Sequence, residues 1–561
     1  MAASPLRKLV TVPPRAFGLF LAAATLLASA PGLVGTWVYD DFGMLDNERY
    51  DDLGDVAAVF AQHSGDYLER LAPGQTEGET YRPITMVTLV AVHAATASPL
   101  AHHALGWALH LATAFALYFA LGFVCGDREG VRRWLTALFA LHPVAVEAYV
   151  WINGRSDVVA GLFLALAIGM LARLGRREVL APREAARWAG GAALVVFAGA
   201  ASKETFLPAV FAAGLATWLR CERGARARWG WAAVGAGLGA ALYLLARAAV
   251  LDFELGVGSG TNALEDAALW ARLPRLEALG AHALITLRPS AMESLAWATF
   301  RPATLAEIAT GVVALAALGG LAWARDWGGV VYLLGAAVTL APTVLVTRLL
   351  WLGLDRFLYL PLILVILAAA PHAAALAARI DASVRRAVAI AALGVLLAAV
   401  GATALSSMQY RDQEAWMANL VAQRPDDPTA HLFVARHLAG EGRLLEARAR
   451  IDQQPPPPWP AAVGIPQILL AAQLRYPALE DRTFTALLGD HPDNALLRAH
   501  GMRWHFLNGR VEEALALAPT LSGTPYCAEV VRQLRIWSRS ASDPSVAARL
   551  ESVADQLRCP P

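Results

Sequence analysis

Long apolar stretches recur along most of the chain, and short polar segments separate them. A helix needs about 20 apolar residues to cross the hydrocarbon core of a bilayer. Stretches that approach this length lie at residues 16–37, 101–124, 132–150, 157–174, 188–202, 205–220, 229–250, 303–323, 328–346, 357–377 and 386–407. The pattern predicts an all-α, polytopic membrane protein with about 11 transmembrane helices.

Two further stretches predict helices that lie in the membrane interface instead of crossing it. The loop at residues 251–302 contains an amphipathic run in which leucines lie near one face. These leucines are Leu269, Leu273, Leu276, Leu284 and Leu287. Residues 83–96 form a short apolar run with polar flanks, and we expect the same position for it.

The arginine-rich loops predict the orientation of the spans. Arginines cluster at residues 128–133, 173–187, 220–228 and 379–386, which are alternate loops on the side of the basic N-terminal residues. Because cytoplasmic loops carry the excess of Arg and Lys, we expect the N-terminus in the cytoplasm and the C-terminal region outside it. The N-terminal run also has the form of a signal peptide, but it stays apolar as far as Val38, which favours a retained span.

The composition changes near Gln409, which predicts a transmembrane domain at residues 1–408 and a helical, extracytoplasmic domain at residues 409–561. Two segments of the second domain, 429–447 and 494–514, share a pattern of helix, turn ending in Gly-Arg, and second helix. This pattern is typical of degenerate tetratricopeptide (TPR) helix pairs. A plain helical domain is the alternative.

The cysteines bear on the compartment of this second domain. Cys527 and Cys559 both lie in it. In an oxidising compartment they can form a disulfide, and two unpaired buried thiols are the alternative.

The overall composition supports a membrane protein. Hydrophobic residues make up 57% of the 561 residues and charged residues 17%, whereas soluble domains carry about 25% charged residues. The net charge of +1 argues against a nucleic-acid partner. Lysine occurs only at Lys8 and Lys203, and this preference for arginine, with abundant alanine, is typical of a GC-rich bacterial genome. We therefore expect a multi-pass protein of the bacterial inner membrane.

Two adjacent acids, Asp40 and Asp41, stand where the first predicted span ends. A charge at membrane depth costs roughly 2.5–3.5 kcal/mol on insertion scales, and the aromatic residues Trp37 and Tyr39 place the acids just beyond the apolar core. One carboxylate can deprotonate an acceptor hydroxyl while the other positions it or holds a cation. The alternative is a pair of solvated charges at a helix end.

Three more groups of charged residues fall on the same predicted side of the membrane. They are His142 with Glu147, Arg155 and Asp157, then Lys203 with Glu204, and finally Asp355 with Arg356. A cationic side chain at the membrane edge can bind a phosphate while neighbouring acids hold it in place. Each group also has a structural interpretation. These are an Arg155–Asp157 ion pair, packing by His142, a Lys203–Glu204 pair, and capping of a span by Arg356.

Six motifs follow one another along the membrane part. They are Tyr39-Asp40-Asp41, Tyr81-Arg82-Pro83-Ile84-Thr85, His142-Pro143-Val144-Ala145-Val146-Glu147, Gly154-Arg155-Ser156-Asp157, Ser202-Lys203-Glu204-Thr205 and Asp355-Arg356-Phe357-Leu358-Tyr359-Leu360-Pro361. As an ordered set they resemble the transmembrane-and-tetratricopeptide (TMTC-type) O-mannosyltransferases and their bacterial relatives in the GT-C glycosyltransferase superfamily. The resemblance covers the membrane part, from the first span to the last.

The resemblance implies a GT-C-like helical bundle that moves a sugar, with inversion, from a polyprenyl-phosphate lipid donor to a protein or glycan acceptor outside the cytoplasm. It implies that Asp40 or Asp41 is the catalytic base. The residues it implies for substrate binding are Arg155, Lys203 and Arg356 at the phosphate, Glu147 and Asp157 in support, and Tyr81, Arg82, His142 and Glu204 from the same motifs. Some members of the superfamily use a divalent cation and others do not, so metal use stays open.

Two other classes of function compete with this interpretation. A transporter or flippase of lipid-linked saccharides also needs outer cationic groups, but it places ionisable residues near mid-membrane and often has repeated halves. Neither feature is evident in the sequence. A non-catalytic scaffold would dock partners on its repeat-like tail, and its aspartates would be dispensable.

Overall fold

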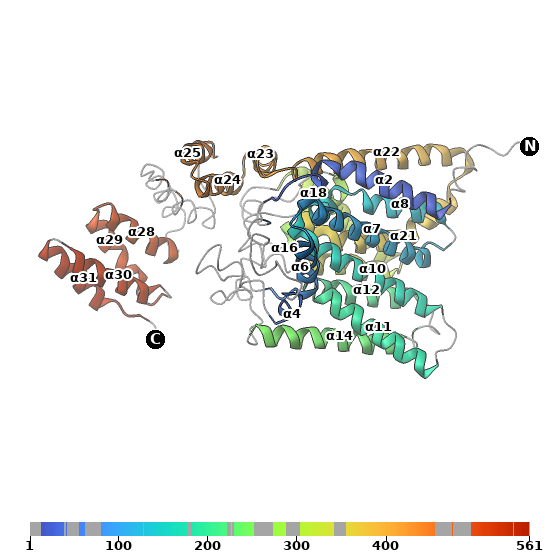
Figure 1. Ribbon diagram of the computed structural model, residues 1–561, viewed down its shortest axis with the longest axis horizontal. Coiled ribbons are helices and arrows are strands. Elements are labelled where there is room, and N and C mark those ends of the chain that lie inside the picture. The colour runs from blue at the N-terminus through green and yellow to red at the C-terminus, as the bar shows by residue number, and fades with distance from the viewer. Residues whose placement is uncertain are drawn as a thin grey trace, which may run out of the picture. The chain divides into compact units, whose positions relative to one another are not determined.

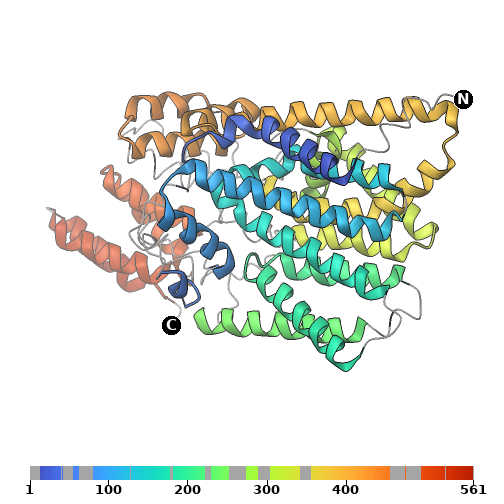
Figure 2. The same ribbon diagram turned by 45° about the vertical axis from the view of Figure 1, so that its right-hand side comes forward.

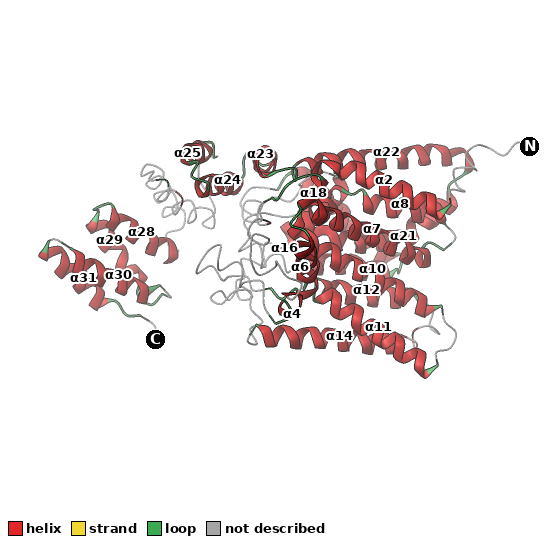
Figure 3. Cartoon of the chain, in the orientation of Figure 1, coloured by secondary structure: helices red, strands yellow, loops and turns green. Residues whose placement is uncertain are grey.

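The computed structural model describes residues 13–38, 41, 55–61, 80–126, 128–176, 181–221, 226, 229–251, 273–287, 303–341, 355–454, 470, 474, 495–524, 526–541 and 543–559. Every regular element in these ranges is a helix, which confirms the predicted all-α class (Figure 3). The chain divides into two compact units, Met1–Gln423 and Arg424–Pro561. The boundary expected between residues 408 and 409 stays a prediction.

The first unit is a bundle of long helices that lie side by side (Figures 1 and 2). Its elements are α2 (Pro14–Leu33), α4 (Asp55–Ala58), α6 (Pro83–Ala95), α7 (Pro99–Val124), α8 (Glu129–Ala140), η2 (Pro143–Ala145), α9 (Val146–Val150), η3 (Ile152–Gly154), α10 (Arg155–Gly175), α11 (Pro182–Ala200), α12 (Phe206–Arg220), α14 (Trp229–Val250), α16 (Leu273–Thr286), α18 (Leu305–Trp323), α19 (Trp327–Leu340), η4 (Asp355–Leu358), α21 (Tyr359–Arg379), α22 (Ala382–Met408) and α23 (Gln413–Gln423). The η elements are 3-10 turns.

The described helices fit a polytopic membrane protein. Seven segments are long and apolar enough to cross a membrane, and they coincide with α2, α7, η3 with α10, α14, α18, η4 with α21, and α22. Three shorter apolar helices are α6, α12 and α19. The helices α6 and α16 contain 13 and 14 residues, so each is about 20 Å long, against about 30 Å for the hydrocarbon core. Their lengths agree with the expected interfacial positions.

Small residues let the helices of the bundle approach closely. A Cβ atom added to Gly235 or Gly239 of α14 would lie 2.0 or 2.2 Å from a backbone oxygen of α11, at Ala189 and Ala193 respectively. The glycines are four residues apart, as are the alanines, so both pairs lie on the facing surfaces. This is the small-residue packing that membrane helices use in place of a hydrophobic driving force.

The predicted span at residues 132–150 is wrong as a single helix. The structure ends α8 at Ala140 and begins η2 at Pro143, which lacks the N–H that a continuing helix needs. The Nδ1 atom of His142 accepts a hydrogen bond from the Val144 N–H at 3.4 Å and so caps the new turn. The chain then passes through α9 and η3 before α10 begins at Arg155.

The second unit contains two helix pairs with the same connecting turn. The pairs are α24 (Pro428–Gly440) with α25 (Leu444–Asp452), and α28 (Ala495–Leu507) with α29 (Val511–Leu517). In the turns, Gly442 and Gly509 adopt φ values of 79° and 73°, which favour glycine. The N–H of the arginine that follows each glycine bonds the carbonyl five residues earlier at 2.8 Å, the Schellman arrangement. The expected helix–turn–helix pattern is thus present twice.

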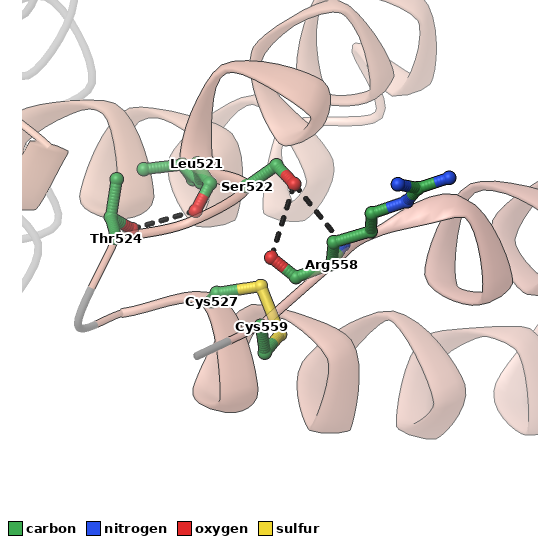
Figure 4. The surroundings of a disulfide bond; sticks show 6 residues. All are labelled: Leu521, Ser522, Thr524, Cys527, Arg558 and Cys559. Carbon is green, nitrogen blue, oxygen red and sulfur yellow. Dashed lines mark hydrogen bonds between the residues drawn. A yellow bond between two sulfur atoms is a disulfide. The ribbon is translucent and has the colours of Figure 1, made fainter. Parts of the chain in front are cut away.

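The other described helices of the second unit are joined to one another near its last described residues. They are η5 (Ala518–Leu521), α30 (Cys527–Ser540) and α31 (Pro544–Gln556). Cys527, at the start of α30, and Cys559, beyond α31, form a disulfide (Figure 4). The hydroxyl of Ser522 accepts a hydrogen bond from the Arg558 N–H at 3.1 Å and donates one to its carbonyl at 3.2 Å. Of the two alternatives for the cysteines, the structure contains the bonded one.

Candidate functional site

The motifs converge on the end of the bundle where α10 begins. The Ile84 N–H at the start of α6 donates to the Ala201 carbonyl at 3.1 Å, and the Thr85 hydroxyl donates to the Ser202 carbonyl at 3.0 Å. These bonds fasten α6 to the turn between α11 and α12. The Glu147 carboxylate accepts a hydrogen bond from the Asp355 N–H at 2.8 Å, which fastens α9 to η4.

Asp41 is a fixed, buried carboxylate at this end of the bundle. Its Oδ2 atom accepts a hydrogen bond from the Val38 N–H, and its Oδ1 atom accepts one from the Asn153 N–H, both at 3.1 Å. The indole N–H of Trp151 donates to the Val38 carbonyl at 3.3 Å. The end of the first span is therefore joined to the turn before α10. Asp40, the other candidate base, lies outside the described residues.

The turn before α10 depends on a close backbone approach at Gly154. A Cβ atom at this position would lie 2.3 Å from the carbonyl oxygen of Glu147, so only glycine fits. The turn directs Arg155 into the protein, where it is 1% exposed. Its terminal nitrogens donate to the Thr88 carbonyl of α6 at 3.1 Å and the His102 carbonyl of α7 at 2.8 Å. Arg155 thereby joins three helices and is not paired with Asp157.

Lys203 and Asp157 form the buried ion pair of the site. The Nζ atom of Lys203 lies 2.5 Å from Oδ1 of Asp157, and the two side chains are 4% and 2% exposed. The interpretation of Lys203 and Glu204 as partners is therefore wrong. Burial, opposed by Asp157 and aided by the positive charges of Arg356 and Arg82, lowers the pKa of Lys203 to about 8.

Glu204 pairs with two arginines instead. The Nε and terminal nitrogens of Arg82 donate to Oε2 of Glu204 at 3.0 and 2.9 Å, and Arg247 of α14 lies 3.5 Å from Oε1. Burial raises the pKa of Glu204, but Arg82 outweighs this effect and the net pKa is lowered. Glu204 and Arg82 thus form a charged clasp between α6 and the turn before α12.

Two other candidates, Tyr81 and His142, have their polar atoms occupied by structural partners. The Tyr81 hydroxyl donates to the Phe60 carbonyl at 3.0 Å, and the Tyr81 ring stacks on Tyr243. The Nε2 atom of His142 lies 3.1 Å from the Leu284 carbonyl of α16, while Nδ1 caps η2. Both ring nitrogens of His142 are therefore engaged by backbone groups, in agreement with packing.

Arg356 differs from every other cation of the site. It is 8% exposed, yet it forms no hydrogen bond or ion pair with any residue in the described part of the chain. Its guanidinium lies 4.2 Å from the Trp151 ring centroid and 5.6 Å from that of Phe357. Lys203 lies over the same Phe357 ring at 4.8 Å. Two buried cations thus share one aromatic residue, an arrangement that an anion would stabilise.

Sequence reasoning missed the groups that hold these charges in place. Phe357 belongs to one of the six motifs and Asn153 directly precedes another, but nothing in their spacing indicates which charge the Phe357 ring or the Asn153 N–H contacts. The Thr88 carbonyl has no sequence signal at all, because every residue presents the same backbone acceptor whatever its side chain is. Within the described residues, no group of three or more His, Cys, Asp or Glu side chains is arranged to hold a metal ion.

Fold and site together define an all-α, polytopic membrane protein with a charged, buried site at one end of its helices. The chain is similar to protein O-mannosyl-transferase TMTC1 of Mus musculus, with 27% identity over 155 residues, which is 28% of this chain and 16% of the mouse protein. The corresponding protein of Homo sapiens is 27% identical over 156 residues, or 28% of this chain and 18% of the human protein. The chain therefore matches less than a fifth of each relative. No family model and no solved structure matches it.

Proposed function

We propose that this protein is a membrane glycosyltransferase that moves a sugar from a polyprenyl-phosphate donor to a hydroxyl of an extracytoplasmic protein or glycan. The observation that carries the proposal is Arg356, a buried guanidinium without an anionic partner in the described part of the chain. It lies over Trp151, whose indole also bonds the segment that leads to Asp41. The similarity to two protein O-mannosyl-transferases supports the same class of reaction.

The donor phosphate binds between the two cations that share the Phe357 ring. Arg356 supplies the main contact, because its guanidinium has all its donors free for phosphate oxygens among the described residues. Lys203, held by Asp157, adds a second positive charge. The leaving group of the reaction is a phosphate monoester, and these cations stabilise its negative charge as the bond to the sugar breaks.

Arg155 acts at the site indirectly. Its terminal nitrogens are occupied by the carbonyls of Thr88 and His102, and this fixes the first turn of α10. We therefore assign it to positioning Asp157, two residues further along the helix. In the same way, Glu147 positions η4 through the Asp355 N–H and so sets the place of Arg356.

The base that activates the acceptor hydroxyl is one of the two acids, Asp40 or Asp41. Asp41 is held in place by the backbone N–H groups of Val38 and Asn153. The base removes the hydroxyl proton, the acceptor oxygen attacks the anomeric carbon, and the phosphate leaves in the same displacement. One such displacement inverts the anomeric configuration.

The Cys527–Cys559 disulfide supports an extracytoplasmic second unit. Disulfides persist in the periplasm and other oxidising compartments but are rare in the cytosol. Together with the arginine-rich loops expected on the cytoplasmic side, the disulfide supports our proposal that the chain lies in a bacterial inner membrane with its candidate site facing outward. The helix pairs of the second unit are of the TPR-like kind and would contact the acceptor.

The test is donor-dependent transfer by the purified full-length protein carrying Arg356→Gln. We expect kcat/KM for a polyprenyl-phosphate sugar to fall about 10- to 100-fold, because a hydrogen-bonded charge contributes about 1.5–3 kcal/mol. The matched control is Arg411→Gln, which removes an exposed arginine from the segment after α22. Unchanged kcat/KM in the Arg356 variant would rule out the phosphate site. Donor binding without any transfer in the wild type would favour a transporter.

A further inference from the structure

A cavity lies at the far end of α10 from the candidate site. Its volume is about 420 Å³, and its walls come from α10, α11, α12 and α14, which neighbour one another in Figure 1. On α10 the wall runs from Ala167 to Leu174, whereas Arg155 and Asp157 lie in the first turn. At 1.5 Å per residue, the cavity begins about 18 Å further along the helix than Arg155. The cavity is therefore separate from the candidate site.

The walls of this cavity combine aliphatic and aromatic side chains with a single cation. Trp188, Trp218 and Trp229 line it, and Arg226 is the one charged residue among the described lining residues. Trp and Arg concentrate where membrane helices meet the headgroup region. The composition of the wall thus fits a ligand with an apolar tail and an anionic head.

Two hydrogen-bond donors at this cavity have no acceptor in the described part of the chain. They are Nε of Arg226 and the indole N–H of Trp229, and both nitrogens are buried. The guanidinium of Arg226 lies 4.6 Å from the Trp218 ring centroid, and one terminal nitrogen donates to the Leu219 carbonyl at 3.3 Å. Because buried donors are nearly always paired, a bound acceptor would complete both groups.

We propose that this cavity binds one anionic phospholipid. The phosphodiester accepts hydrogen bonds from Arg226 and Trp229, and an acyl chain lies against the apolar wall. One guanidinium matches the single negative charge of a phosphodiester. A zwitterionic headgroup would also bring its own cation toward Arg226. Basic pockets between membrane helices bind anionic headgroups for this reason.

One substitution in the cavity wall can block the lipid acyl chain without changing the contacts that Arg226 and Trp229 make with the phosphodiester. A Cβ atom added to Gly214, which lines the wall, would meet only the end of the Leu171 side chain, at 3.9 Å. A leucine at this position therefore extends into the cavity. Gly214→Leu therefore tests binding of the acyl chain, whereas Arg226→Gln and Trp229→Phe test binding of the phosphodiester.

The experiment is native mass spectrometry of the full-length protein in detergent with added dioleoylphosphatidylglycerol or dioleoylphosphatidylcholine. For the wild type we expect a Kd for phosphatidylglycerol about tenfold below that for phosphatidylcholine, because both lipids offer the same phosphodiester but only phosphatidylcholine brings a cation close to Arg226. Arg226→Gln should lose most of this preference, whereas Trp229→Phe and Gly214→Leu should weaken binding of both lipids. Arg187→Gln, which removes an exposed arginine from α11, is the matched control and should bind as the wild type does.

Three results would overturn the proposal. One is equal affinity of the wild type for the two lipids, and another is wild-type behaviour of Arg226→Gln or Gly214→Leu. The third is displacement of phosphatidylglycerol by a polyprenyl phosphate at equal concentration, which would assign the cavity to the isoprenoid lipid. The thermal unfolding temperature of each variant in the same detergent separates loss of lipid from loss of fold.

Discussion

The buried Lys203–Asp157 pair allows the strongest prediction about stability. The two atoms in contact lie 2.5 Å apart, and the side chains are 4% and 2% exposed. Lys203→Met keeps an unbranched side chain but leaves the Asp157 carboxylate buried without its cation. The Oδ2 atom of Asp157 already has no hydrogen-bond partner among the described residues. Breaking a buried pair in this way costs about 3–5 kcal/mol of unfolding free energy.

The pair can be isolated from other effects by a double-mutant cycle. Asp157→Asn alone leaves the Lys203 ammonium buried among Arg356 and Arg82, so it should also be strongly destabilising. The double variant leaves neither member of this pair as a lone buried charge, and its cost should be about 2 kcal/mol smaller than the sum of the single costs. The exposed Arg549–Glu512 pair of the second unit serves as the reference cycle and should show no measurable coupling.

The assay is chemical unfolding of the full-length protein in detergent, followed by tryptophan fluorescence, for the wild type and the three variants. The unfolding free energies give the coupling directly. Costs of Lys203→Met and Asp157→Asn that add to within about 0.5 kcal/mol would refute the pairing. Single variants as stable as the wild type would refute the burial of the charges.

Two further predictions concern pH and helix packing. Because burial, opposed by Asp157, lowers the pKa of Lys203 to about 8, the ammonium is lost as the pH rises through this value. The kcat/KM for the donor should therefore decline above about pH 8. Lys203→Arg should move this decline to higher pH. The same decline of kcat/KM at high pH in both proteins would contradict the role of the Lys203 ammonium in donor binding. Gly239→Leu should prevent folding of the bundle, since even its Cβ would lie 2.2 Å from a backbone oxygen of α11. Gly237→Ala has no atom within 4 Å of its new Cβ and should elute like the wild type in size-exclusion chromatography.

Helices of the bundle could be predicted from the sequence because each depends on a local signal. The apolar runs of α7, α10 and α22 are long enough to be recognised as membrane spans from the sequence alone. The break between α8 and η2 was missed, since the apolar run continues through it. The physical cause was local all the same: Pro143 ends the hydrogen-bond ladder, and His142 caps the turn that follows.

The partners within the site could not be predicted, because they depend on contacts between distant segments. Sequence adjacency favoured Lys203 with Glu204, but successive residues point in different directions. Lys203 instead reaches Asp157, 46 positions earlier, and Glu204 reaches Arg82, 122 positions earlier. The same limit applies to Cys527 and Cys559, whose pairing needed the distance between their backbones. The residue types of the site were evident, whereas their pairing required the fold.

The central claim is that the acids after the first span activate an acceptor hydroxyl for attack on a polyprenyl-phosphate sugar. The most direct measurement is sugar transfer by the purified full-length protein, with the wild type compared with Asp40→Asn and Asp41→Asn at equal amounts of folded protein. A lost general base lowers the rate about 10²- to 10⁴-fold, and we predict a loss of this size in at least one variant. Wild-type rates in both variants would contradict the account.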